Sequence, residues 1–134
     1  MTIKIFLIAI NDNGVSGPKI GCNDSVVGVD RIFPSTSSPL TDSTRYLVSL
    51  RDTYYGQSGL YNVFYQSRLS VESVTLVSGK ATIRLTGTVA LGGECDDPRF
   101  EAQLKYTAMQ FSTVKSVDIF VNGKPLSSIL GGHG

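Results

Sequence analysis

Short apolar stretches, several of them alternating with polar residues at a period of two, predict strands in this chain. In the last of these stretches Val117, Ile119 and Val121 take every second position, as in a strand with one covered face. The first stretch ends in a continuous apolar run, which indicates a strand entering a covered part of a sheet. The expected strands are residues 3–10, 26–32, 71–77, 80–86 and 117–122.

Two other stretches repeat apolar residues at helical spacing. The first helix is expected at about 39–54, with Pro39 in its first turn. The second begins at Asp96-Asp97-Pro98, where either aspartate can act as N-cap and Pro98 suits the first helical position. The buried face of the second helix is expected to contain Phe100, Leu104, Thr107, Ala108 and Phe111.

Turn signals separate these elements. Asn122-Gly123 and Ser78-Gly79 are tight-turn sequences, since Gly and Asn tolerate positive φ. Residues 11–14 have the composition of a calcium loop, but position 22 is Cys where a bidentate Glu is needed, so a turn is expected. The order of elements predicts an α+β fold in which two helices pack on one face of a mixed, mostly antiparallel sheet of about four to five strands.

Composition limits the class of protein. With 134 residues, 41% hydrophobic and 17% charged, the chain is expected to form one domain over residues 1–130, followed by a flexible tail at 131–134. The net charge is +1 without a long basic run, so no nucleic-acid partner is indicated. The apolar stretch 3–10 is too short to span a membrane and does not have the form of a signal peptide.

The two cysteines, Cys22 and Cys95, allow two interpretations. Both could be buried, inert thiols, which are common. Alternatively they pair, since each lies in a Gly- and Asp-rich loop that suits a surface disulfide. Such a bond would close a loop of about 74 residues and stabilise the fold by roughly 4 kcal/mol in the chain-entropy model. It would also indicate an oxidising compartment.

The segment 54–69 is unusually rich in aromatic residues. Aromatic side chains with polar tips are enriched at interfaces, which makes this segment a candidate interaction surface. The alternative is a long loop that fixes itself to the domain through its rings. The candidate residues are Tyr54, Tyr55, Tyr61, Phe64 and Tyr65.

Few residues can support catalysis. The single histidine, His133, lies in a Gly-rich terminus, and no phosphate-binding motif is present. Glu94, Asp96, Asp97 and Glu101 form an acidic cluster, but a capping role explains the two aspartates. No catalytic residue, metal or cofactor is therefore expected. The alternative is a small-ligand or glycan binder or hydrolase, with Glu94, Asp97 or Glu101 in its site.

Two stretches resemble GerMN domains. Residues 70–88, SVESVTLVSGKATIRLTGT, are similar to the hairpin that follows the first helix in that family, and residues 101–126 are similar to its second half, which ends in VNGKP. Ser112 stands where the family usually has Pro after Gln-Phe.

The resemblance implies a small α+β module of an extracytoplasmic bacterial protein, secreted or lipid-anchored, of the type named from sporulation and spore germination. The family's fold is similar to the ring-building motif, which implies a protein partner and a role in envelope assembly. No catalytic residues are known for the family. The implied compartment favours the Cys22–Cys95 disulfide, and a lipid anchor in the native precursor is compatible with it.

Overall fold

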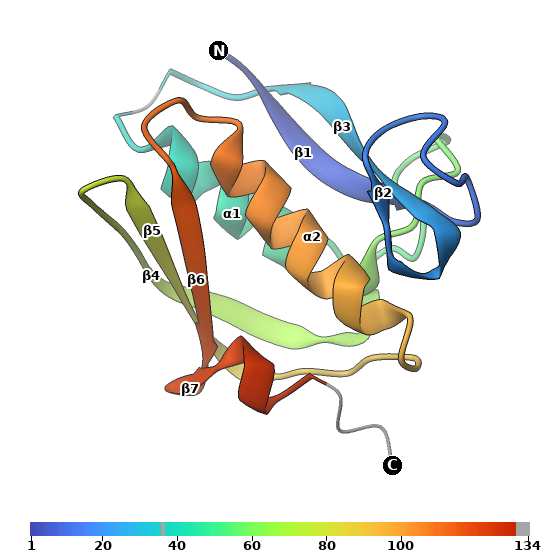
Figure 1. Cartoon of the computed structure of the whole chain (residues 1–134). Coiled ribbons are helices and arrows are strands. Elements are labelled where there is room, and N and C mark those ends of the chain that lie inside the picture. Colours follow the sequence, from blue (N-terminus) through green and yellow to red (C-terminus); the bar gives the residue numbers. More distant parts are fainter. Residues whose placement is uncertain (36, 131–134) are drawn as a thin grey trace.

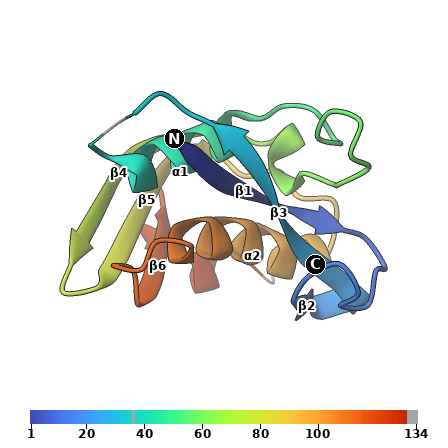
Figure 2. The same cartoon turned by 90° about the horizontal axis from the view of Figure 1, so that it is seen from above.

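The computed structural model describes residues 1–35 and 37–130, and two α-helices in these ranges lie between two β-sheets (Figure 1). Helix α1 spans Pro39–Ser49 and packs against strands of both sheets. Helix α2 spans Asp96–Met109 and does the same. In the view of Figure 2 the N-terminal strands lie in front of helix α2, and the hairpin of residues 68–88 lies at the left.

The first sheet is antiparallel, with the strand order β1-β3-β2. Its strands are β1 (Thr2–Ala9), β2 (Lys19–Ile20) and β3 (Asp24–Ile32). The second sheet has the order β4-β5-β6-β7 and is antiparallel except for the parallel pair β5–β6. Its strands are β4 (Arg68–Val77), β5 (Lys80–Thr88), β6 (Ser116–Val121) and β7 (Lys124–Pro125).

One hydrophobic core joins both sheets to both helices. Leu7 from β1, Leu47 from α1, Ile83 from β5 and Leu104 from α2 are all fully buried within it. Burial alternates along β5, because every second side chain faces the helices. In the described residues the core is therefore continuous across three layers.

The predicted α+β class, the two helices and the mostly antiparallel pairing are confirmed. The strands form two sheets, because β1 and β3 pair with each other on the far side of the helices from β4–β6. Helix α1 ends at Ser49, earlier than predicted, since Leu50 already has extended backbone angles. The buried Asn62 amide donates to the carbonyls of Leu50 and Asp52, which holds the chain in this extended path.

The predicted tight turns are present. Asn122 and Gly123 have φ values of 52° and 80°, and Ser78 and Gly79 have 51° and 83°. At residues 11–14 the carboxylate of Asp12 accepts hydrogen bonds from Ser16 and Ser25, which is typical of a turn. Gly131–Gly134, including His133, lie outside the described residues. None of the helices in the described part of the chain is long and apolar enough to cross a membrane.

Candidate functional site

The start of helix α2 differs from the sequence prediction. Cys95 is the N-cap and Asp96 is the first helical residue, so Pro98 occupies the third position instead of the first. The Asp96 carboxylate turns back from the helix and accepts hydrogen bonds from the Gly92 N–H at 2.6 Å and from the Tyr61 hydroxyl at 3.0 Å. Only 3% of Asp96 is exposed. The prediction that Asp96 or Asp97 is the N-cap is wrong, because Cys95 holds that position and the Asp96 carboxylate binds Gly92, Tyr61 and Arg99.

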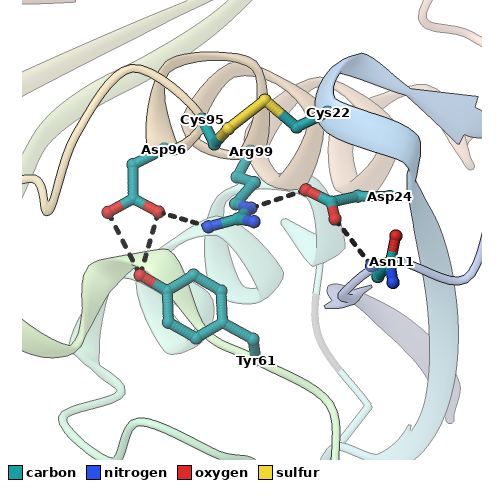
Figure 3. Close-up of a disulfide and its surroundings, with 7 residues drawn as sticks. All are labelled: Asn11, Cys22, Asp24, Tyr61, Cys95, Asp96 and Arg99. Atoms are coloured by element: carbon teal, nitrogen blue, oxygen red, sulfur yellow. Dashed lines mark hydrogen bonds and ion pairs between the residues drawn. A yellow bond between two sulfur atoms is a disulfide. The ribbon is translucent and has the colours of Figure 1, made fainter.

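Arg99 lies between two buried carboxylates (Figure 3). Its Nη1 atom is 3.0 Å from Oδ1 of Asp96, and its Nε atom is 2.7 Å from Oδ2 of Asp24. The other oxygen of Asp24 accepts from the Asn11 N–H at 2.8 Å. Burial alone would lower the pKa of Arg99, but its hydrogen bonds to Asp24 and Asp96 outweigh this and raise the pKa. The guanidinium therefore stays charged and neutralises part of the negative charge around it.

A disulfide links Cys22 and Cys95 beside these charges. It joins the short 3-10 turn Gly21–Asn23 to the residue before helix α2, across a sequence separation of 73 residues. The interpretation of two buried, free thiols does not apply. Together the disulfide and its polar neighbours form what we call the disulfide cluster: Cys22, Asp24, Tyr61, Cys95, Asp96 and Arg99.

Two of the predicted surface aromatics lie inside the protein. Phe64 is fully buried, and its ring centroid lies 4.9 Å from that of Phe100. Tyr61 is 7% exposed and exchanges two backbone hydrogen bonds with Ile8 at the free edge of β1. Burial, and then the nearby Asp96 carboxylate, raises the pKa of Tyr61 above its ordinary value. These two rings fix the segment to the domain and cannot form a contact surface, which corrects the prediction for them.

The other three predicted aromatics remain accessible in part. Tyr54 is 53% exposed and packs its ring edge-on against Tyr61, with centroids 6.3 Å apart. Tyr65 packs on Tyr61 as well, at 5.9 Å, and is half-buried. Tyr55 is half-buried, with its hydroxyl 3.3 Å from that of Tyr46. Burial and this contact raise the pKa of Tyr46 to about 12. Tyr54, Tyr55 and Tyr65 are what remains of the candidate surface, and we call them the tyrosine surface.

An open pocket of about 240 Å³ lies next to the disulfide. Of the four acids in the predicted cluster, only Asp96 lines it, together with Tyr61 and Arg99. Glu94 is exposed and Glu101 lies in a different groove beside Lys105. The structure therefore does not place two of these four carboxylates across one cleft, which is what a glycosidase would need. No group of three or more potential metal ligands is found in the described part of the chain.

The sequence prediction missed Asp24 and Arg99. A local signal for Arg99 exists, since an Asp and an Arg three residues apart share one face of a helix. Asp24 follows Cys22 by two residues, and Arg99 follows Cys95 by four. A Cys22–Cys95 pairing would therefore have brought the two charges near each other. Only the fold, however, turns both side chains inward.

These features define the class: a small, disulfide-linked α+β domain whose buried charges are paired with one another. The family described as Germane, sporulation and spore germination, matches residues 8–127, and the chain belongs to this family. The GerMN resemblance predicted from the sequence is confirmed. Among curated proteins none matches the chain.

Solved structures of GerMN domains have a similar fold. The first GerMN domain of the sporulation protein GerM from Bacillus subtilis is 17% identical, over 93% of this chain and 85% of that one, with a TM-score of 0.65. The tandem GerMN domains of the same protein are 20% identical, over 92% of this chain and 39% of that one, with a TM-score of 0.64. At such identities the similarity concerns the fold alone.

Proposed function

We propose that this domain is a non-catalytic, extracytoplasmic module for protein–protein interaction in the assembly of the bacterial envelope. Membership of the sporulation and germination family supports this, as does the similarity in fold to GerMN domains. The observation that carries the proposal is the disulfide cluster. Its ionisable side chains are bonded to one another, so they stabilise the fold and are not available to a substrate.

The bonding of Asp96 is the main argument against catalysis. A general acid or base must reach the proton it transfers, and its pKa must suit that task. The Asp96 carboxylate already accepts from Gly92, Tyr61 and Arg99, and the guanidinium of Arg99 is shared with Asp24. A substrate would have to replace these hydrogen bonds in a buried position, at a cost of about 1–3 kcal/mol for each unsatisfied group.

The disulfide supports an extracytoplasmic location. Cys22 lies in an exposed turn, and Cys95 is half-buried. Disulfides of this kind persist in oxidising compartments and are rare in the cytosol. Export by a signal peptide or attachment by a lipid anchor in the native precursor belongs to the same proposal.

The tyrosine surface is the proposed contact region. Tyr54 offers an exposed ring whose position is fixed by Tyr61, and half-buried Tyr55 and Tyr65 lie in the same segment. Rigid aromatic rings lose little entropy on binding, which makes them effective contact residues. A Tyr54→Ser change should therefore weaken binding of the partner while the fold is kept.

Photo-crosslinking in the native host tests this proposal. The photoreactive residue p-benzoylphenylalanine is placed at Tyr54, and the control position is Glu72, which is exposed on the edge strand β4. We expect a discrete protein adduct from Tyr54 and none from Glu72. If Tyr54 and every other exposed position scanned give no adduct, the interaction function is wrong. An adduct that forms only at other positions would reject the tyrosine surface alone.

A second candidate is a binder of a small ligand or glycan at the cell envelope. The pocket beside the disulfide favours it, because that pocket joins an aromatic ring, Tyr61, to a carboxylate, Asp96. NMR titration with soluble peptidoglycan fragments is the test, with the amides of Gly92 and Gly93 as reporters at the pocket lining. Saturable shifts there support the candidate, and unmoved amides at millimolar fragment exclude it.

A further inference from the structure

Strand β6 has an edge that the fold leaves partly open. Along one side, β6 pairs with β5 from Ser116 to Val121. Along the other side, β7 pairs only with Phe120 and Val121. The chain leaves the sheet after Pro125, where a 3-10 turn at Leu126–Ser128 begins. Among the residues that the structure describes, the first part of β6 therefore has no neighbouring strand on its outer side.

The alternation of the ladder shows which backbone groups face this edge. The N–H of Ser116 donates to the Gly79 carbonyl at 3.2 Å, and the N–H of Asn122 donates to the Leu85 carbonyl at 2.8 Å. In both cases the acceptor lies 37 positions before the donor in the sequence, so the two bonds belong to the same ladder. Even-numbered residues of β6 thus direct their backbone groups to β5, and odd-numbered residues direct theirs outward. Val121 faces β7, which leaves the N–H and C=O groups of Val117 and Ile119 at the open edge.

A groove of about 310 Å³ runs along this edge, between β6 and helix α2. Val117, Ile119 and Leu126 contribute apolar surface to it. Helix α2 contributes Glu101 and Lys105, both exposed, and neither forms an ion pair in the part of the chain that the structure describes. The groove thus combines unpaired backbone groups, an apolar floor and two unpaired charges of opposite sign.

The spacing of the two charges matches that of an extended strand. Residues four apart on a helix are separated by about 6 Å along its axis, and residues two apart on a strand by about 6.7 Å on one face. Helix α2 and strand β6 run in opposite directions (Figure 1). The order of residues along the two elements therefore puts Glu101 toward the Val121 end of β6 and Lys105 toward the Val117 end. A strand antiparallel to β6, as β7 is, would meet Glu101 first and Lys105 second.

We propose that this groove binds an extended segment of a protein partner as an added strand antiparallel to β6. The segment carries a basic residue followed two positions later by an acidic residue. Their aliphatic stems lie over Val117 and Ile119, and their charges meet Glu101 and Lys105. The backbone of the segment forms hydrogen bonds with the N–H and C=O groups of Val117 and Ile119. It extends the strand position of β7 beyond Leu126, where the chain itself turns away from the sheet. The proposal rests on the interaction function, since it assumes a protein partner, and it uses a surface other than the tyrosine surface.

The opposite edge of this sheet is less suited to strand addition. Strand β4 has a register shift between Val71 and Ser73 that places the exposed Glu72 in a bulge. Bulges and edge charges hinder strand addition. The β4 edge of a second copy of the domain is therefore interrupted and does not suit the β6 groove. This favours a segment of a different protein as the occupant.

Two peptides of equal composition test the proposal. Ac-Thr-Val-Lys-Val-Glu-Val-Thr-NH2 has the matching charge order, and Ac-Thr-Val-Glu-Val-Lys-Val-Thr-NH2 has the reverse order. In an NMR titration of the whole domain, we expect the matching peptide to shift the amides of Val117 and Ile119 and to slow their hydrogen exchange. The reversed peptide should bind about tenfold more weakly, because two favourable charge pairs become unfavourable.

A charge-swapped variant provides the matched control. Glu101→Lys/Lys105→Glu keeps the composition and changes only exposed side chains, so we expect it to prefer the reversed peptide by a similar factor. Equal affinity for both peptides, or unmoved Val117 and Ile119 amides at millimolar peptide, would overturn the proposal. Self-association that the swap abolishes would assign the edge to a second copy and would also overturn it. If the Tyr54 adduct forms while these amides stay unmoved, the interaction function stands and the groove assignment fails.

Discussion

Helix α2 carries charged side chains in two settings that differ sharply. At its first turn, Asp96 is buried and Arg99 is partly buried, and the two are bound to Tyr61, Asp24 and each other. Glu101 and Lys105 lie further along the same helix, within two turns of Arg99. Both are exposed, and neither forms an ion pair within the described residues. Charges of both signs thus occur in each setting, and only their burial and partners differ.

The two settings imply different roles for the charges: the buried ones stabilise the fold, and the exposed ones are available for binding. A buried charge must be paired, and removing one partner leaves the other uncompensated, so the disulfide cluster stabilises the fold only as a complete set. An exposed charge costs little to leave unpaired and stays free to meet a partner. We therefore expect changes in the disulfide cluster to act on stability, and changes at Glu101 and Lys105 to act on binding.

The disulfide should give the largest effect on stability. Cys22→Ser/Cys95→Ser should lower the free energy of unfolding by about 4 kcal/mol, because the bond closes a long loop in the unfolded chain. Denaturation by guanidinium, measured with and without reductant, checks this. The wild type under reductant should approach the variant, and the variant should not respond to reductant. A wild type that is equally stable in both conditions would contradict the expectation.

Asp96→Ala should follow, with a loss of about 3 kcal/mol in the free energy of unfolding. The change leaves the Tyr61 hydroxyl and the Gly92 N–H without their buried acceptor and removes one of the two carboxylates from Arg99. Urea denaturation is the measurement, and Glu101→Ala on the same helix is the matched control, expected within about 0.5 kcal/mol of the wild type. An equal loss of unfolding free energy in Asp96→Ala and Glu101→Ala would show that the buried and the exposed charges of α2 do not differ in their effect on stability.

Alkaline pH should weaken the fold through two tyrosines. The pKa of Tyr61 is raised by burial and by Asp96, and that of Tyr46 is raised to about 12. The folded state then holds these protons more tightly than the unfolded state, whose tyrosines ionise near pH 10. Stability is complete below about pH 10 and falls as the pH rises above it, by at most about 1.4 kcal/mol per pH unit for each group.

Absorbance titration of the tyrosines, together with unfolding at a series of pH values, checks this expectation. Tyr46 and Tyr61 should ionise at a higher pH than a free tyrosine does. Tyr46→Phe should remove one late step and leave the other. Ionisation of all tyrosines in one step near pH 10, with constant stability above it, would show that neither hydroxyl is held in its neutral form.

Glu101→Lys/Lys105→Glu should have the smallest effect on stability. It reverses the favourable order of an acid and a base four residues apart on a helix, which costs about 0.3 kcal/mol. Thermal unfolding followed by circular dichroism is the measurement, at low and high salt. A large loss would mean that these charges take part in the fold, and the proposed role of the groove would then lose its basis.

Much of the fold could be predicted from the sequence because its signals are local. The alternation in β5 and β6 depends on neighbouring residues, and the Asn122-Gly123 and Ser78-Gly79 turns depend on two residues each. The end of α1 was misjudged, since the apolar pattern continues through Leu50 while Asn62, far along the chain, holds that segment extended. Local periodicity carries no information about such a partner.

The candidate site was less predictable because its residues meet only in the folded chain. Acidic residues at a helix start favour a capping prediction, yet the partners of Asp96 include Tyr61, 35 residues away. The aromatic segment was recognised by composition, but composition does not distinguish Phe64 in the core from Tyr54 at the surface. Asp24 and Arg99 lie 75 residues apart, and in the sequence only the neighbouring cysteines connect the two positions.

By itself, the sequence determined the α+β class, the two helices, most strand positions, the tight turns and the resemblance to GerMN domains, because each depends on short-range periodicity or on runs of adjacent residues. Only the tertiary structure decided that β1 and β3 form a second sheet, that Asp96 binds Tyr61 and Arg99, and that the β6 edge stays open beside Glu101 and Lys105. The physical reason is that burial and pairing depend on the packing of distant segments, which fixes the surroundings of each charge.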